Sequence, residues 1–251
     1  MNIHAIIQAR SASTRLPRKV LKTILGKPML VHQYERVKRS RKIDKIIIAT
    51  STDQADDGIA AMFSSLDVSV YRGHLTDVLE RFYLAAKFSG DPDYVIRLTG
   101  DCPLVDWKLI DRLIDFHIQS GFDYSSNCRK PTFPDGLDAE IFSFNVLEIA
   151  HQNAKKEYER EHVTPYIYFN SHKFRVGSYE NKDDYSNLRW TVDEADDFKF
   201  VSKIYQALYP LNPDFDFKDI LKFLEKNAGL SQINNKYVRN EKFEEQVRQE
   251  K

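Results

Sequence analysis

Residues 3–19 read IHAIIQARSASTRLPRK, an apolar run that passes directly into a cationic loop. The run from Ile3 to Ala9 is short and apolar, which predicts a strand buried inside a sheet. Four cations follow the run: Arg10, Arg15, Arg18 and Lys19. Small hydroxylated residues stand between these cations, so backbone N–H groups can approach phosphate oxygens while the side chains neutralise their charge. The stretch predicts a loop that holds a triphosphate, with a solvated basic loop as the alternative.

Strand and helix patterns alternate after this loop. Short apolar or β-branched runs predict strands over 43–49, 68–71 and 94–98. Apolar residues at helical spacing predict helices over 29–38, 56–64, 76–88 and 106–118. Such alternation forms βαβ units and a mainly parallel α/β sheet, whose ligands bind beyond the carboxyl ends of the strands. The loops after Ala9, Tyr71 and Leu98 are therefore the places where a ligand is expected.

The pattern changes after Asp123, where prolines and a glycine interrupt the chain. Beyond this point we expect strands over 139–144, 174–179 and 188–192 and helices over 157–169, 194–208 and 216–226. Residues 123–184 are interpreted as an extension of one domain that spans 1–210. The remainder, 211–251, is expected to be a helix and a charged tail that is loose from Ser231 onward. Over 241–251 the mixed charges predict a solvated helix or a frayed tail, with a partner-binding segment as the alternative.

The composition excludes several classes of protein. Among 251 residues, Lys and Arg total 37 and Asp and Glu also total 37, so we expect no general phosphate-neutralising face for nucleic acid. The 12% of aromatic residues argues against global disorder. Two cysteines, Cys102 and Cys128, are too few for a disulfide scaffold and lack metal-site spacing. The sequence has no apolar stretch of about 20 residues and its N-terminal run is too short for a signal peptide, so we expect a cytoplasmic protein without a membrane span.

Two aspartates stand at predicted strand ends. Asp101 lies in RLTGDCPL (97–104), and Asp193 lies in LRWTVDEADD (188–197). A carboxylate at such a position can hold Mg²⁺, which usually takes one or two carboxylates together with substrate phosphates. Each aspartate has an alternative role, Asp101 as a turn or helix cap and Asp193 as a helix N-cap. Metal binding by both requires that they converge, and a separation well over ~10 Å would exclude it.

The cationic loop follows neither the GxxxxGK[ST] nor the GxGxxG pattern of glycine-rich phosphate loops. Instead, ARSASTRLPRKVL (9–21) closely resembles the N-terminal signature of the sugar-acid cytidylyltransferases, the family of 3-deoxy-manno-octulosonate cytidylyltransferase and CMP-sialic acid synthetase. RLTGDCPLVD (97–106) resembles their metal-binding segment. Three further segments are most similar to the branch typified by spore-coat polysaccharide cytidylyltransferases: PDGLDAEIFS (134–143), EREHVTPYIY (159–168) and LRWTVDEADDF (188–198).

This resemblance implies a Rossmann-like nucleotidyltransferase fold with a mixed, mainly parallel sheet and a β-containing extension that forms a homodimer. It implies transfer of CMP from CTP to a sugar acid or to a phosphorylated sugar or polyol, with release of pyrophosphate. Mg²⁺ is the implied cofactor, and the implied product serves surface polysaccharide or glycan synthesis.

The resemblance also assigns roles to individual residues. Asp101 and Asp193 would hold the metal ion. The catalytic cations would be Arg10, Arg15 and Lys19. Nucleotide contacts are expected from Ala9, Arg10, Ser11, Ser13, Arg15, Lys19, Arg72, Gly73, Asp77, Thr99 and Gly100. Arg18 departs from the family, in which glycine frequently precedes the loop lysine.

The acceptor is expected to lie against the extension. Asp138 and Glu140 share one strand face, where carboxylates can accept hydrogen bonds from sugar hydroxyls, unless that face is simply exposed. Arg160 and His162 match residues beside the family's active site, and His162 is either a general base or a packed or capping histidine. Asn127 is a candidate contact for an acceptor phosphate or carboxylate, with a solvated turn as the alternative.

Two other functions stay open at this point, and a third, a GT-A glycosyltransferase, is discounted. A sugar 1-phosphate nucleotidylyltransferase that uses GTP or UTP would have the same loop. A GT-A glycosyltransferase needs a DxD motif after a strand, whereas Asp91-Pro92-Asp93 precedes one. A non-catalytic nucleotide-binding subunit would bind nucleotide without turnover. That last reading is disfavoured by the joint presence of four residues: Arg15, Lys19, Asp101 and Asp193.

Overall fold

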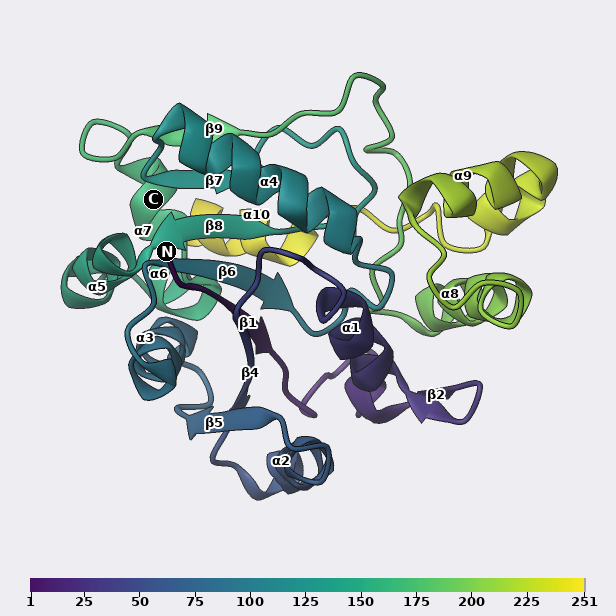
Figure 1. Cartoon of the computed structure of the whole chain (residues 1–251), viewed down its shortest axis with the longest axis horizontal. Coiled ribbons are helices and arrows are strands. Elements are labelled where there is room, and N and C mark those ends of the chain that lie inside the picture. Colours follow the sequence, from purple (N-terminus) through teal and green to yellow (C-terminus); the bar gives the residue numbers. More distant parts are fainter. Residues whose placement is uncertain (251) are drawn as a thin grey trace.

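The computed structural model describes residues 1–250, and its centre is a seven-stranded sheet with the strand order β5-β4-β1-β6-β8-β7-β9 (Figure 1). Four neighbouring strands are parallel: β1 (Ile3–Gln8), β4 (Lys45–Ser51), β5 (Ser69–Gly73) and β6 (Tyr94–Thr99). The others are β7 (Tyr124–Ser126), β8 (Glu140–Ser143) and β9 (Val176–Ser178). β8 is antiparallel to β6 and β7, and β9 is parallel to β7. The predicted α/β fold with a mixed, mainly parallel sheet is confirmed.

Helices connect the strands and cover the sheet. The α-helices are α1 (Met29–Val37), α2 (Asp57–Ser64), α3 (Val78–Ser89), α4 (Trp107–Ser120), α5 (Phe144–Asn153), α6 (Glu157–His162), α7 (Pro165–Phe169), α8 (Ala195–Leu208), α9 (Phe217–Lys226) and α10 (Glu241–Gln249). The shorter elements are the 3₁₀ turns η1 (Lys19–Leu21), η2 (Gln54–Asp56) and η3 (Ala228–Gln232) and the hairpin of β2 (Thr23–Ile24) and β3 (Lys27–Pro28). Within residues 1–250, no helix has the length and apolarity that crossing a bilayer requires.

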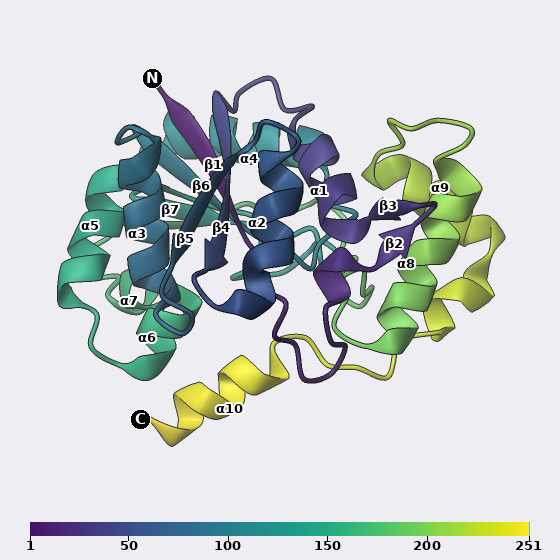
Figure 2. The same cartoon turned by 90° about the horizontal axis from the view of Figure 1, so that it is seen from below.

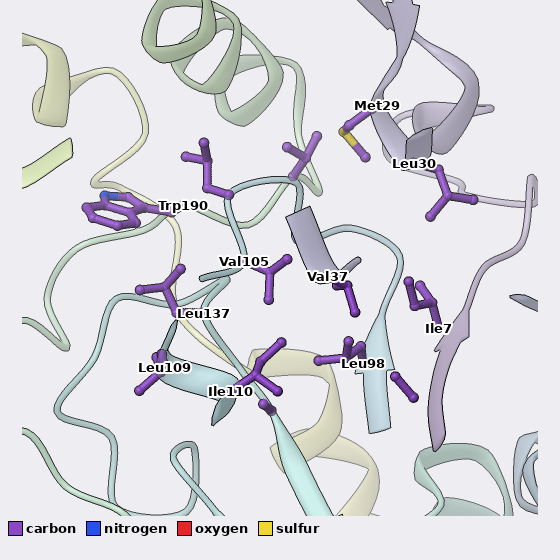
Figure 3. Packing of buried hydrophobic residues seen from close by; sticks show 14 of the residues in the cluster. Ile7, Met29, Leu30, Val37, Leu98, Val105, Leu109, Ile110, Leu137 and Trp190 are labelled. Atoms are coloured by element: carbon purple, nitrogen blue, oxygen red, sulfur yellow. The ribbon is translucent and has the colours of Figure 1, made fainter. Parts of the chain in front are cut away.

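Both faces of the sheet are buried, which explains the unbroken apolar runs of its central strands. In β1, Ile3, Ala5 and Ile7 belong to one hydrophobic cluster, together with residues of α1, α4 and α8. Ile6 points to the other face and joins a second cluster with residues of α3 and α5. Figure 3 shows the first cluster, in which Ile7 lies near Leu98 of β6 and side chains of α1, and the α4 residues lie on the other side of Leu98. Because both faces are covered, the strand ends are the part of the sheet that a ligand can reach.

The structure corrects two elements predicted after Asp123. The strand predicted over 188–192 is wrong, because this segment makes only an isolated bridge between Asp135 and Arg189 within the described chain. The helix predicted over 157–169 is broken into α6 and α7 at Val163, whose φ of 72° no β-branched residue adopts inside a helix.

Two further differences concern helices. α5 directly follows β8 and was not predicted. The chain after Ser231, predicted to be loose or frayed, continues η3 and then forms α10, which lies beyond the carboxyl ends of the strands (Figure 2). The strands of the predicted extension, β7, β8 and β9, continue the central sheet and form no layer of their own.

Buried His117 of α4 makes folding stability depend on pH. Its Nδ1 lies 2.9 Å from Ser125 Oγ, and burial lowers its pKa from 6.5 to about 4. As the pH falls, His117 is protonated in the unfolded chain at a higher pH than in the folded chain. The stability that is present above pH 6.5 is therefore lost progressively towards pH 4. Between pH 7 and 4.5 we expect this group alone to lower the free energy of unfolding by about 2 kcal/mol.

Urea denaturation of the wild type and of His117→Gln at both pH values measures this contribution. The variant should lose about 2 kcal/mol less than the wild type on acidification. Equal losses in the two proteins would show that His117 does not carry the pH dependence.

Candidate active site

A cavity of about 690 Å³ opens at the carboxyl ends of β1 and β6. Residues just beyond β1 and β6, including Ala9 and Gly100, form its floor together with the cationic loop. Its other walls come from the segment before β8, from α6, from 189–193 and from 238–249. The position is where sheets of this class bind ligands, and the volume suits a small-molecule site.

Lys19 joins the two aspartates that stand at predicted strand ends. Its Nζ donates hydrogen bonds to Asp101 Oδ2 at 2.9 Å and to Asp193 Oδ1 at 2.8 Å. These oxygens therefore lie no more than about 6 Å apart, and the predicted convergence of the two carboxylates is present. Burial would raise the pKa of Asp101, but the surrounding charge and hydrogen bonds, led by Lys19, lower that pKa to about 2. Burial would likewise lower the pKa of Lys19, and the two carboxylates raise it instead.

The segment 189–193, which carries Asp193, crosses the backbone of 135–136, and this crossing brings Asp193 to Asp101. The carbonyl of Asp135 accepts hydrogen bonds at 2.6 and 2.9 Å from two N–H groups of this segment, and Val192 N–H donates to the Asp101 carbonyl at 2.8 Å. Gly136 allows the close approach, since its φ is +104° and a Cβ there would stand 2.3 Å from a backbone nitrogen of the same segment. The crossing explains why aspartates distant in sequence share one site.

Asp193 is also paired with two arginines. Arg15 Nη2 lies 2.8 Å from Asp193 Oδ1, and Arg189 Nη2 lies 3.2 Å from Oδ2. Arg189 is buried and pairs with Asp135 and Asp197 as well, each at 2.9 Å. A polyanion that draws Arg15 away would therefore leave Asp193 oriented by Arg189.

Backbone and carboxylate contacts give the cationic loop its shape. The Ser11 carbonyl accepts hydrogen bonds from the N–H groups of Ser13 at 2.9 Å and Arg18 at 3.1 Å. Ser11 N–H donates to the buried Asp56 carboxylate at 2.6 Å. Arg18 has a φ of 56°, in the left-handed region that favours glycine. The loop is a preformed turn.

Residues 4–243 match the family model described as Cytidylyltransferase. The chain belongs to the cytidylyltransferase family. It is 41% identical to an uncharacterised protein of Methanocaldococcus jannaschii, over 98% of this chain and 99% of the relative. It is 33% identical to the spore coat polysaccharide biosynthesis protein SpsF of Bacillus subtilis, over 88% and 93%. The predicted resemblance is confirmed, and the chain is a nucleotidyltransferase.

Solved structures agree with the fold of this cytidylyltransferase. A cytidylyltransferase from Leptospira borgpetersenii superposes with a TM-score of 0.87 at 33% identity, over 95% of this chain and 99% of that one. A CMP:2-keto-3-deoxy-manno-octonic acid synthetase complexed with CTP has a TM-score of 0.63 at 16% identity, over 82% and 99%. The second likeness supports the fold alone.

Seven predicted nucleotide contacts of the cytidylyltransferase line the cavity: Ala9, Arg10, Ser13, Arg15, Lys19, Thr99 and Gly100. Four others lie outside the described lining: Ser11, Arg72, Gly73 and Asp77. Arg72 donates to the Ser51 and Asp53 carbonyls and pairs with Asp57 at 2.7 Å, so its guanidinium is committed to the β4–α2 connection. Asp77 caps α3 by accepting from Glu80 N–H at 2.9 Å. In this structure both side chains are therefore engaged by partners within the protein.

Asp138, Glu140 and His162 line the cavity, whereas Asn127 and Arg160 lie outside its described lining. The Asn127 amide is fully buried and bridges the backbone before β8, donating to one carbonyl at 2.7 Å and accepting from an N–H at 2.8 Å. Arg160 pairs with Asp77 at 2.6 Å and so joins α6 to the start of α3. The alternative of a solvated turn at Asn127 is therefore wrong. Both residues hold segments next to the cavity in place without lining it.

Glu140 lies on a buried strand face, so the alternative of an exposed face is wrong. It is 4% exposed and pairs with Arg97. Its second oxygen accepts hydrogen bonds from the hydroxyls of Tyr124 at 2.5 Å and Thr164 at 2.7 Å. These donors hold Glu140 in place at the inner wall of the cavity.

Several lining residues were missed by the sequence analysis: Arg81, Arg97, Thr164, Tyr168, Arg189 and most of 238–249. Arg97 and Arg189 lie inside the segments quoted for Asp101 and Asp193, so their position in those segments was the available signal. The C-terminal residues gave no signal, because their mixed charges read as a solvated helix.

Proposed function

We propose that this chain transfers CMP from CTP to a sugar acid or to a phosphorylated sugar or polyol and releases pyrophosphate. The observation that carries the proposal is the buried Lys19 ammonium between Asp101 and Asp193 at the floor of the cavity. Family membership and the sugar-acid activity named for several relatives support CTP and such an acceptor.

In the proposed reaction an acceptor oxygen attacks the α-phosphorus in line, and pyrophosphate leaves. Such a transfer depends on positioning and on stabilising charge as it develops. Arg10, Arg15 and Lys19 line one side of the cavity and would bind the phosphates. Arg15 and Lys19 would exchange their carboxylate partners for phosphate oxygens, while Arg189 keeps Asp193 oriented.

The donor set at the floor of the cavity fits Mg²⁺. Asp101 and Asp193 would hold the ion, since carboxylate oxygens are the ligands it prefers, and a cation, the Lys19 ammonium, already stands between them. An ion held by these two carboxylates would take further ligands from substrate phosphates. When bound, Mg²⁺ would supply charge neutralisation at the α-phosphate and the acceptor oxygen.

A nucleotide panel tests the function. The purified chain is incubated with Mg²⁺, one of CTP, UTP, GTP or ATP, and acceptors that include 3-deoxy-manno-octulosonate and sugar 1-phosphates, and pyrophosphate release is followed. We expect release with CTP. Release with GTP or UTP alone would replace the proposal by the sugar 1-phosphate alternative, and nucleotide binding without release would favour a non-catalytic subunit.

Asp101→Asn should weaken the dependence on Mg²⁺. Because one carboxylate ligand is lost, the Mg²⁺ concentration for half-maximal pyrophosphate release should rise at least ~10-fold. The fold should persist, since Lys19 keeps Asp193 as a partner. Asp115→Asn is the matched control: Asp115 pairs with Lys42 at 2.7 Å on the surface. If both variants had the same Mg²⁺ dependence, Asp101 would not be a ligand of the metal ion.

The proposal extends to location and assembly. It takes residues 1–210 as the nucleotidyltransferase domain, to which residues 238–249 add one wall of the cavity, and residues 123–184 as the dimer-forming part. It takes the cytoplasm as the compartment, and surface polysaccharide or glycan synthesis as the destination of the product. The name of the SpsF relative supports that destination. A homodimer predicts a solution mass of twice 29.3 kDa by light scattering.

A further inference from the structure

Residues 234–250, which we name the C-terminal strap, cross the cavity and end in α10 (Figure 2). We propose that the C-terminal strap forms the acceptor-side wall of the active site and that Glu245 is a specificity-determining residue that binds acceptor hydroxyl groups. The inference rests on the proposed function and assigns the side of the cavity opposite the cationic loop.

The strap is anchored first beside the metal-site aspartates. Asn234 is 1% exposed, and its Nδ2 donates to the Arg189 carbonyl at 2.9 Å and to Asp197 Oδ1 at 2.8 Å. The Tyr237 hydroxyl lies 3.2 Å from Asp196 Oδ2. The strap therefore begins on the same segment that carries Asp193.

The middle of the strap contacts a predicted acceptor residue. Arg239 pairs with Asp138, and its Nη1 donates to the Phe133 carbonyl at 3.3 Å. Burial raises the pKa of Asp138, and Arg239 opposes that rise. Arg239 is therefore a positioning residue that keeps a carboxylate in the cavity wall.

The far end of the strap contacts a second of the five predicted acceptor residues, His162. His162 Nε2 lies 3.0 Å from Gln246 Oε1, and the His162 ring stands edge-on to Phe243 at 4.7 Å. Glu250 accepts hydrogen bonds from the first N–H groups of α6 at 3.1 and 3.2 Å, and Val247 is buried. α10 thus packs along α6 and places its remaining face against the cavity.

The chemistry of that face fits the hydroxyl-bearing part of an acceptor and not its carboxylate or phosphate. Asn240, Glu241, Glu245 and Gln249 line the cavity, and all of them offer carbonyl or carboxylate oxygens. Carboxylates repel a triphosphate but accept hydrogen bonds from hydroxyls. The phosphates therefore bind at the cationic loop, and the acceptor lies between that loop and the strap.

Two adjacent glutamates of α10 provide a matched test. Both side chains are exposed, but only Glu245 lines the cavity, and Glu244 lies 3.9 Å from Arg248. With 3-deoxy-manno-octulosonate as the acceptor probe, Glu245→Gln should raise the acceptor KM about tenfold, the effect of one charged hydrogen bond, and leave the CTP KM within twofold. Glu244→Gln should leave both constants unchanged. Equal constants for the two variants, or a rise in the CTP KM alone, would overturn the inference.

A truncation after Asn240 removes α10 but keeps Asn234 and Arg239. Calorimetry should find CTP binding within twofold of the wild type, while the acceptor KM rises more than tenfold. Loss of CTP binding in the truncated chain alone would overturn the acceptor-side assignment. Absence of CTP binding in the wild type would instead overturn the proposed function, so the two failures are distinguishable.

Discussion

Lys19→Ala is expected to lower kcat for pyrophosphate release by ~10²–10³, the loss typical of one group that stabilises transition-state charge. The ammonium is buried at the floor of the cavity, 2.9 Å from Asp101 and 2.8 Å from Asp193. Alanine removes the cation that would meet the phosphates and leaves the two carboxylates to repel each other. CTP binding should weaken less than kcat falls, because Arg10 and Arg15 still face the phosphates.

The control is Lys22→Ala. Lys22 is exposed and lies over the Phe198 ring at 5.7 Å, so its loss changes the charge of the same region without touching the cavity. Steady-state kinetics should show wild-type kcat for Lys22→Ala, and thermal melting should show both variants folded. A kcat within threefold of wild type for Lys19→Ala would remove Lys19 from the catalytic machinery.

Gly136→Ala should lower the free energy of unfolding by at least about 3 kcal/mol. A Cβ at position 136 would stand 2.3 Å from Thr191 N and 2.5 Å from Trp190 C, and the φ of +104° is unfavourable for alanine. These contacts are with backbone, so relief requires the Asp193 segment to move away from Asp101. In a chain of this size the expected fall in Tm is about 10 °C.

Gly229→Ala is the matched control, since a Cβ there meets nothing within 4 Å. Its Tm should change by less than about 2 °C. Differential scanning calorimetry of both variants, with pyrophosphate release measured at a temperature where each is folded, separates stability from activity. An unchanged Tm for Gly136→Ala would mean that the segment 189–193 can move away from residue 136 without a loss of stability.

The parallel half of the fold and the floor of the site were predictable from local pattern. The β-branched run at Ile46–Ile48 becomes a central strand because both of its faces are covered, and such strands carry little polar interruption. The convergence of Asp101 and Asp193 was predictable because each ends a predicted strand and strand ends share one edge. The strand expected before Asp193 is only an isolated bridge, and Asp193 is brought to Asp101 by the crossing of 189–193 over 135–136.

The rest of the site depends on contacts between residues far apart in sequence. Arg72 stands at a strand end, as a nucleotide contact should, but the Ser51 and Asp53 carbonyls engage its guanidinium. The partners of the C-terminal strap are likewise distant: Arg239 meets Asp138, and Gln246 meets His162. Contacts between such distant polar residues produce no periodic pattern in the sequence. A charged segment that packs against the protein therefore has the same sequence pattern as one that stays in solvent.

The placement of α10 affects how the protein is purified and immobilised. Gln249 borders the cavity, so an affinity tag or surface linker fused close behind α10 would lie beside the cavity. Met1 lies near Asp93, just before β6, at the opposite end of the sheet (Figure 2). Amino-terminal fusions are therefore preferable, and a carboxyl-terminal tag is expected to depress the measured affinity for the second substrate even when the nucleotide binds normally.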